Sequence, residues 1–307
     1  MTTAESAARF EQVAALLPFV LRRRLEELPE RAKAQGEELR LRAGKPLCVS
    51  YPDGERPIAG TAVTQEHLRT VLEVASGASV HTVMEQLKNG FVPIAGGHRL
   101  GLCGTAVVRE GALSNLRAVS SLSLRVAREL TGISAAVLPR AMGEDGLENL
   151  LILSPPGGGK TTLLRDVIRA VSAGEAAEPL RVGVVDERGE LAAMVNGSPG
   201  LDVGPHTDVM DGCPKALGLT ALIRGMNPQV LAVDEITAPQ DVEAILQAAG
   251  CGVKLLATAH AGGIEDLKRR PLYRTLLEER LFSRFIVIGG RGTARTYTIL
   301  DGAGKEC

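Results

Sequence analysis

Residues 150–162 read Leu150-Leu151-Ile152-Leu153-Ser154-Pro155-Pro156-Gly157-Gly158-Gly159-Lys160-Thr161-Thr162, an apolar run followed by a glycine-rich turn that ends in Lys-Thr. Glycines let consecutive backbone N–H groups converge on phosphate oxygens, and the positive end of a following helix points to the same place. In such a loop Lys160 reaches the β- and γ-phosphates and Thr161 holds Mg²⁺. Apolar residues at helical spacing follow the turn, so the stretch predicts a nucleoside triphosphate site between a strand and a helix.

The phosphate loop departs from the strict motif at one position, because serine stands at Ser154 where the motif has glycine. That glycine serves the tight turn more than phosphate contact, and serine is small. The alternative is a surface turn rich in glycine and proline that happens to precede Lys-Thr-Thr; the strand and helix patterns on either side argue against it. We predict that the loop consists of Ser154, Pro155, Pro156, Gly157, Gly158, Gly159, Lys160, Thr161 and Thr162.

Composition and length favour two domains and give no general attraction to nucleic acid. The chain has 307 residues, of which 45% are hydrophobic, and a net charge of -1. Aromatic residues make up only 3% and tryptophan is missing, which leaves few rings to stack on bases. We therefore expect no direct nucleic-acid partner. Basic residues outnumber acidic ones before residue 140, and the reverse holds after it.

The cysteines and the apolar runs predict a cytoplasmic protein without a membrane span. The five cysteines are scattered, odd in number and without a CxxC pair, which argues against a zinc site and a disulfide framework. Reduced thiols in the cytosol fit this pattern best. The longest early apolar run, residues 13–21, is too short to cross a bilayer, so we expect neither a signal peptide nor a transmembrane helix.

The chain divides into two segments that differ in their pattern of predicted strands and helices. Residues 1–140 predict a small α+β domain, with amphipathic helices over residues 5–28 divided near Pro18, strands near Leu39 and Val49, a helix over 65–75, a glycine-rich hairpin over 96–104 and a strand over 116–127. Residues 143–146 are the expected linker. Residues 147–301 alternate strands and helices, with one helix over 265–279, so we predict an α/β domain with a mainly parallel sheet.

Asp234 and Glu235 end the apolar run 230–233, about 70 residues after the phosphate loop, where a later strand of the same sheet is expected. At that strand end Asp234 would bind the Mg²⁺ shell. Glu235 would point towards the γ-phosphate and polarise an attacking water, which suits hydrolysis. An ordinary pair of acidic residues at a strand end is the alternative, and the phosphate loop makes it weaker.

Two further groups of polar residues end predicted strands. Thr258 and His260 follow the apolar run 254–257, and either one could sense the γ-phosphate or position water, although a lone histidine is more often a packed or capping residue. Glu187 or Glu190, after the run 182–185, could complete the surroundings of the metal and the water. The alternative for this acidic segment is a solvated turn. Residues 204–215 form a long polar segment that could move with the nucleotide state.

Taken together, these motifs resemble the stage III sporulation protein AA family, which is itself similar to the type II and type IV secretion ATPases. The matching segments are the phosphate loop and residues 185–188, 207–215, 233–236 and 258–260, and in the first domain residues 39–46, 96–101 and 120–125. The resemblance covers nearly the whole chain and implies a RecA-like P-loop NTPase core preceded by the smaller α+β domain. It also implies ATP rather than GTP, because no residue here has an obvious way to recognise guanine.

In secretion ATPases arginines of the amino-terminal domain reach the phosphates, and the acidic and histidine segments flank the nucleotide. The resemblance therefore implies catalytic roles for Lys160, Glu187, Glu235 and His260, and makes Arg40, Arg42, Arg99, Arg125 and Arg128 candidates that act across a subunit boundary. Any one of these arginines could equally be an ordinary surface residue of a half-exposed strand. Of these arginines, we predict a catalytic role for Arg125.

The resemblance implies an Mg²⁺-dependent ATPase in a homohexameric ring, on the mother-cell cytoplasmic face of a channel between mother cell and forespore. Membrane components of that apparatus would be its partners. A non-hydrolytic ATP-dependent switch or scaffold is the second hypothesis, although Glu235 speaks against it because such a protein would not need the residue. A nucleic-acid translocase is the third; it would require a basic groove that carries aromatic residues.

Overall fold

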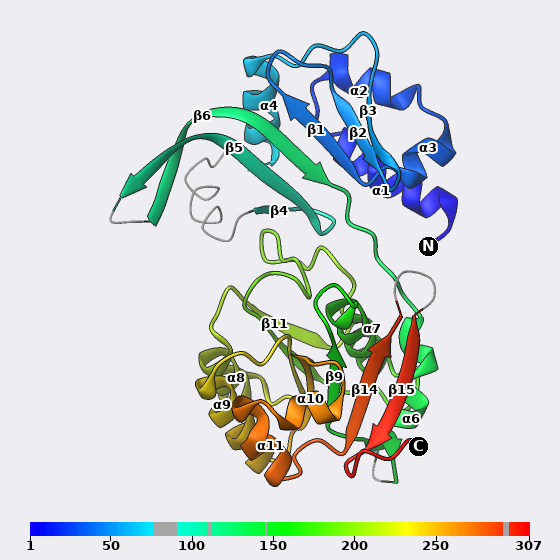
Figure 1. Ribbon diagram of the computed structural model, residues 1–307, viewed down its shortest axis with the longest axis vertical. Helices are drawn as coiled ribbons and strands as arrows, with labels where there is room; N and C mark the ends of the chain where they lie inside the picture. Colours follow the sequence, from blue (N-terminus) through cyan, green and yellow to red (C-terminus); the bar gives the residue numbers. More distant parts are fainter. Residues whose placement is uncertain (76–90, 110–111, 145, 291–294) are drawn as a thin grey trace. The chain divides into compact units, whose positions relative to one another are not determined.

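The computed structural model describes the chain except for residues 76–90, 110–111, 145 and 291–294 (Figure 1). The described residues form two compact units. The first unit comprises Met1–Glu129 and Ala193–Leu201, and the second comprises Leu130–Ala192 and Asp202–Cys307.

The first unit is an antiparallel sheet with helices, in the strand order β3-β2-β1-β6-β5-β4. Its elements are α1 (Thr3–Ala14), α2 (Phe19–Glu26), α3 (Glu30–Gln35), β1 (Glu38–Arg42), β2 (Cys48–Tyr51), β3 (Gly54–Pro57), α4 (Gln65–Ala75), β4 (Val92–Ile94), β5 (His98–Arg109) and β6 (Ala112–Arg125). Pro18 caps α2 and so confirms the predicted division of the early helices. Residues 96 and 97 form the turn that leads into β5, a much longer strand than the predicted hairpin over 96–104.

The core of the first unit follows from the period-2 pattern of its strands. Leu39 and Leu41 are fully buried on β1, whereas their neighbours on the same strand are partly exposed. They join an apolar cluster that includes Phe10 and Leu25 from the helices. Because one face of the sheet is covered and the other is not, a shift of one residue in the register of β1 would expose this core.

His98 is a buried polar residue of the first unit, at the start of β5. Its Nδ1 accepts a hydrogen bond of 2.9 Å from the backbone N–H of Ala127, so its Nε2 carries the hydrogen and donates to Gln12 Oε1 at 3.1 Å. Burial lowers the pKa of His98 from 6.5 to about 4, and the positive charge of Arg9 acts in the same direction. His98, at the start of β5, therefore links α1 to the segment that follows β6.

We expect the chain to lose stability as the pH falls through the range between these two values. The unfolded state binds a proton at His98 near pH 6.5, whereas the folded state excludes it until about pH 4. The contribution of His98 is therefore complete above pH 6.5, and roughly 2 to 3 kcal/mol of it is lost by pH 4.5. Urea unfolding at pH 7 and pH 4.5 measures this loss. The His98→Gln variant should lose less between the two pH values, whereas substitution of the partly exposed His67 by glutamine should leave the loss unchanged.

The second unit contains a seven-stranded sheet in the order β11-β10-β12-β13-β9-β14-β15 (Figure 1). All neighbouring pairs are parallel except β14 and β15, which are antiparallel. Its strands are β7 (Met142–Gly143), β8 (Gly146–Leu147), β9 (Leu150–Ser154), β10 (Val182–Asp186), β11 (Thr207–Asp211), β12 (Val230–Val233), β13 (Lys254–His260), β14 (Arg284–Gly289) and β15 (Thr296–Asp301), of which β7 and β8 form a separate hairpin. Its helices are η2 (Ile133–Ala136), α6 (Leu138–Ala141), α7 (Lys160–Ala173), α8 (Lys215–Met226), α9 (Pro239–Gly250), α10 (Ile264–Lys268), η3 (Pro271–Tyr273) and α11 (Arg274–Glu278).

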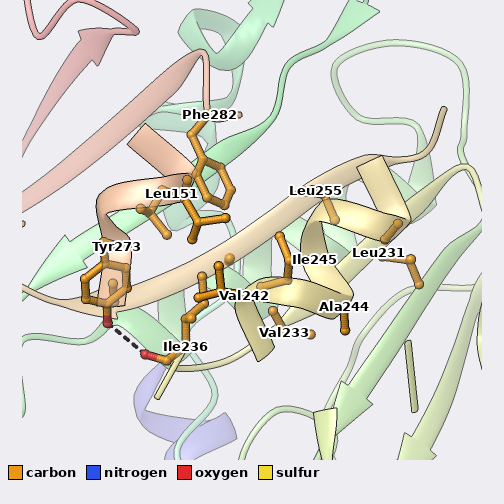
Figure 2. Close-up of a cluster of buried hydrophobic side chains, with 14 of the residues drawn as sticks. Leu151, Leu231, Val233, Ile236, Val242, Ala244, Ile245, Leu255, Tyr273 and Phe282 are labelled. Carbon is orange, nitrogen blue, oxygen red and sulfur yellow. Dashed lines mark hydrogen bonds between the residues drawn. The ribbon is translucent and has the colours of Figure 1, made fainter. Parts of the chain in front are cut away.

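Continuous apolar runs place the central strands inside the sheet. Every residue of β9, β10 and β12 is buried, which is the pattern of strands covered by helices on both faces. Figure 2 shows one of the two layers of this core, in which Val242, Ala244 and Ile245 of α9 lie over the strands. The strand β13 lies between β12 and β9.

The structure differs from the sequence predictions in four places. The expected linker over 143–146 is the hairpin β7–β8 of the second unit, and the units divide between Glu129 and Leu130 rather than near residue 140. The buried carboxylate of Asp166 explains this boundary, because it accepts backbone hydrogen bonds from Gly132 and Ser134 at 2.9 and 2.6 Å. The predicted helix over 265–279 is interrupted at Pro271, and the polar segment 204–215 contains the edge strand β11.

Candidate nucleotide site

The phosphate loop connects β9 to α7 and has the backbone shape of an anion site. Gly157 and Gly159 lie in the left-handed region, with φ of 73° and 98°, which other residues adopt only with strain. A Cβ on Gly158 would stand 2.2 Å from Ser154 Oγ, so serine at the first position of the loop requires glycine at the fifth. Ser154 Oγ donates to Pro155 O at 2.9 Å, which satisfies the buried hydroxyl within the turn.

Lys160 is the first residue of α7 and is 6% exposed. Its ammonium donates to Ser154 O at 3.3 Å and contacts His260 Nδ1 at 2.7 Å. Burial lowers the pKa of Lys160, while Asp234 and Glu235 act in the opposite direction. A buried cation held by neutral partners at a helix N-terminus is suited to bind phosphate.

Thr161 and Asp234 come together as predicted for a metal site. Thr161 Oγ1 donates to Asp234 Oδ2 at 2.6 Å, and Thr258 Oγ1 donates to the other carboxylate oxygen, also at 2.6 Å. A hydroxyl and a carboxylate are hard oxygen ligands of the kind that Mg²⁺ takes together with phosphate oxygens and water. The donor set at this position therefore fits a magnesium ion.

Glu235 follows β12 with a left-handed backbone, at φ 57°. Its backbone N–H donates to Thr258 Oγ1 at 2.9 Å. Its carboxylate forms a hydrogen-bonded ion pair with Arg188 at 3.0 Å and contacts His260 Nε2 through the other oxygen. A non-glycine residue in this conformation is a strained arrangement that occurs most often at functional sites.

His260 lies between Lys160 of the phosphate loop and Glu235 and contacts both. Its Nδ1 faces the Lys160 ammonium, which can only donate hydrogen bonds. Nδ1 is therefore the acceptor, and Nε2 carries the ring hydrogen. That hydrogen points to Glu235 Oε1. The prediction from sequence left open whether His260 is a packed residue; its ring is about one-third exposed and contacts the phosphate-loop lysine and Glu235 directly.

The acidic segment after β10 is organised by Asp186, which is 2% exposed. Its carboxylate accepts backbone hydrogen bonds from Glu190, Leu191 and Ala192 at 2.8 to 3.0 Å. Arg165 of α7 donates to the backbone oxygens of Glu190 and Leu191, both at 2.6 Å. The helix of the phosphate loop and the acidic segment therefore hold one another in place.

Glu187 has a partner that the sequence did not predict, because it pairs with Lys215 at the start of α8. Lys215 is 4% exposed, and its ammonium also lies 3.9 Å from Asp241 on α9. Neither Lys215 nor Arg188 is among the predicted site residues, although both lie in segments that match the family. Their positions, a charged residue at the start of a helix and one just after a strand, are the sequence features that could have identified them. Among the residues that the structure describes, no hydrogen bond or ion pair joins Glu187 to the phosphate loop.

The backbone after Glu235 is anchored from the short helix η3. Tyr273 is buried and its hydroxyl donates to Ile236 O at 2.7 Å, as the dashed line in Figure 2 marks. Burial raises the pKa of Tyr273, so the hydroxyl keeps its hydrogen. Ile236 N–H in turn donates to Thr258 O at 3.1 Å. The acidic pair therefore sits on a backbone that is hydrogen-bonded on both sides.

The candidate arginines lie in the first unit and most of them have local partners. Arg40 pairs with Glu38 at 3.0 Å, Arg42 with Glu55 at 2.6 Å, Arg99 stacks over Phe91, and Arg128 donates to Gly36 O. Arg42 holds the pKa of Glu55 down at about 2. Arg125 is exposed at the end of β6, opposite Glu38 and Arg99 in register. Their roles at the phosphates stay predictions.

The fold and the phosphate loop define a RecA-like α/β protein of the kind found in secretion ATPases. Among solved structures, the ATPase DotB of Legionella pneumophila is similar with a TM-score of 0.59 at 16% identity, over 93% of this chain and 81% of that one. The pilus retraction motor PilT with bound ADP is similar with a TM-score of 0.57 at 16% identity, over 86% and 78%.

The chain belongs to the family described as sporulation stage III, protein AA, which matches residues 7–306. Stage III sporulation protein AA of Bacillus subtilis (strain 168) is 39% identical over 295 residues, which are 95% of each chain. These comparisons confirm the predicted family and the predicted fold class. Within the part of the chain that the structure describes, none of the helices combines the length and the apolar character that a membrane span requires.

Proposed function

We propose that this protein is an Mg²⁺-dependent ATPase whose hydrolysis of ATP powers or assembles a sporulation channel between mother cell and forespore. The observation that carries the proposal is the position of Glu235, one residue after the metal-site carboxylate and joined to the phosphate-loop lysine through His260. A protein that only binds nucleotide has no use for a carboxylate at that point.

The residues of the site have separate tasks in this reaction. The backbone of the phosphate loop and Lys160 would bind the β- and γ-phosphates. Thr161 and Asp234 would hold a magnesium ion, which would supply charge neutralisation at the phosphates. Glu235 accepts the proton of the attacking water. Each Glu235 carboxylate oxygen has one contact in this structure, with Arg188 or with His260, and keeps a further lone pair that can accept the hydrogen of a water.

The proposal includes a homohexameric ring at the cytoplasmic face of the mother-cell membrane, with membrane components of the channel as partners. Resemblance to the secretion ATPases supports this part, together with the exposed Arg125 that a neighbouring subunit would present to the phosphates. Phosphate release measured over a range of protein concentrations, with Mg²⁺ and with EDTA, tests it. We expect turnover per chain to need Mg²⁺ and to rise with concentration as the ring forms.

The competing hypotheses give different results in the same assay. A switch or scaffold would bind ATP without release of phosphate at any concentration, and a translocase would bind single-stranded DNA at low salt. The comparison with Glu235→Gln, described below, separates hydrolysis from binding.

A further inference from the structure

The hairpin β14–β15 brings one arginine to the phosphate loop from a part of the sequence that carries no recognised motif. The strand β14 runs parallel to β9, with Val287 opposite Leu153, so both strands end at the same edge of the sheet. The strand β15 returns from that edge and begins at Thr296, directly after Arg295. Figure 1 shows β14 between β9 and β15, and the end of β14 and the start of β15 lie at the same edge of the sheet.

The guanidinium of Arg295 lies against the backbone of the phosphate loop. A Cβ built on Gly159 would stand 2.9 Å from Arg295 Cζ and 3.2 Å from each of its terminal nitrogens. Gly159 is the residue before Lys160 and has a φ of 98°, so its lack of a side chain both permits the turn and admits the guanidinium. The Nε of Arg295 is buried and has no hydrogen-bond partner among the residues that the structure describes.

The geometry points to Arg295 as a nucleotide-binding residue that acts within its own chain, on the phosphates that are not transferred. This inference rests on the proposed nucleotide site. Arginine is suited to the role because its planar fork donates two parallel hydrogen bonds to phosphate oxygens. The buried Nε is a donor that an anion in the loop can satisfy.

The order of the strands assigns Arg295 to the non-transferred phosphates. Glu235 follows β12 and His260 ends β13, and both strands lie on one side of β9. The hairpin that carries Arg295 lies on the other side of β9. A triphosphate whose γ-phosphate faces Glu235 therefore extends its α- and β-phosphates away from β13 and towards Arg295. This contact is separate from the one predicted for arginines of a neighbouring subunit.

Titrations of the full chain with fluorescent ADP and fluorescent ATP test the inference. We expect Arg295→Ala to weaken both nucleotides alike, by about 10- to 100-fold, which is the usual effect of a lost hydrogen bond between charged groups. Arg295→Lys should restore part of the affinity because it keeps the charge without the fork. Arg274→Ala is the matched control, since Arg274 is an exposed arginine of the same unit on α11, and it should bind as the wild type does.

Competition by inorganic pyrophosphate distinguishes contact with phosphate from contact with the base. The inhibition constant of pyrophosphate, calculated from displacement of fluorescent ADP and the ADP affinity of each protein, should be higher for Arg295→Ala than for the wild type. Unchanged competition, unchanged affinity for both nucleotides, or a loss confined to ATP would each overturn the inference. If thermal unfolding shows that Arg295→Ala is damaged, Arg295→Gln, which removes the charge at similar length, replaces it. A wild-type chain that binds neither nucleotide would instead overturn the proposed function on which the inference rests.

Discussion

We expect Glu235→Gln to lower ATP turnover by a factor of about 10² to 10⁴ while ATP binding persists. The amide has the shape of the carboxylate but cannot accept the proton of the attacking water. The backbone around residue 235 should be retained, because its hydrogen bonds to Thr258 and the anchor at Ile236 do not involve the substituted group. Substitution removes the ion pair with Arg188 and leaves Lys160 and the metal ligands in place.

Phosphate release at saturating ATP and the affinity for fluorescent ATP, measured on the same preparation, check this prediction. Glu243→Gln is the control, since Glu243 is exposed on α9, and its turnover should equal that of the wild type. Full hydrolysis by Glu235→Gln would remove Glu235 from the role of catalytic base. Loss of ATP binding would show instead that the carboxylate is needed to shape the site.

The second large effect is expected at Lys160, where replacement by alanine should reduce turnover to background and weaken ATP binding by at least about 100-fold. The substitution removes the cation that binds the phosphates and leaves Ser154 O and His260 Nδ1 without their donor. Both partners lie at the phosphate loop, so the loss is local. Unlike Glu235→Gln, this variant should fail at binding and not only at hydrolysis.

The affinity of Lys160→Ala for fluorescent ATP, measured beside that of Lys268→Ala, checks the prediction. Lys268 is exposed on α10, and its removal should leave binding unchanged. ATP affinity of the Lys160→Ala variant equal to that of the wild type would contradict the assignment of residues 154–162 as the phosphate loop. Thermal unfolding of each variant shows whether a loss of binding reflects the site or the fold.

The sequence could predict those elements in which the spacing of apolar residues matches the burial of the same residues in the fold. The buried strands β9 and β12 are continuous apolar runs, and a motif follows each of them, so their place in a parallel sheet could be inferred together with the loop and the acidic pair. The helix α4 has the predicted bounds because its apolar residues recur at helical spacing. The predicted neighbours Lys160, Asp234 and His260 meet because parallel strands end at one edge.

Sequence could not predict features that depend on partners distant in the chain. Three of the five residues of strand β11 are polar and none is buried, so its sequence has no strand pattern; it is a strand because it pairs with the edge of β10. The pairing of Glu187 with Lys215 joins residues 28 positions apart on different elements. The unit boundary depends on Asp166, which draws the backbone at Gly132 and Ser134 into the second unit. No local pattern reports any of these contacts.

The break in the helix predicted over 265–279 had a visible cause. Proline at position 271 cannot continue a helix, and it begins the short turn η3 between α10 and α11. The break matters for the site because it places Tyr273 in the core, where its hydroxyl reaches Ile236. The prediction from helical periodicity placed Tyr273, the residue that anchors the acidic pair, within one continuous helix.

Thr258 gives the two acidic residues a shared reference point. Its buried hydroxyl donates to the Asp234 carboxylate and accepts from the backbone N–H of Glu235, so one side chain of β13 holds both residues that follow β12. In the proposed reaction the metal ligand and the base would therefore move together with β13. Control of that reaction would have to act on the groups around them, such as Arg188, because Thr258 holds the two acidic residues in one arrangement.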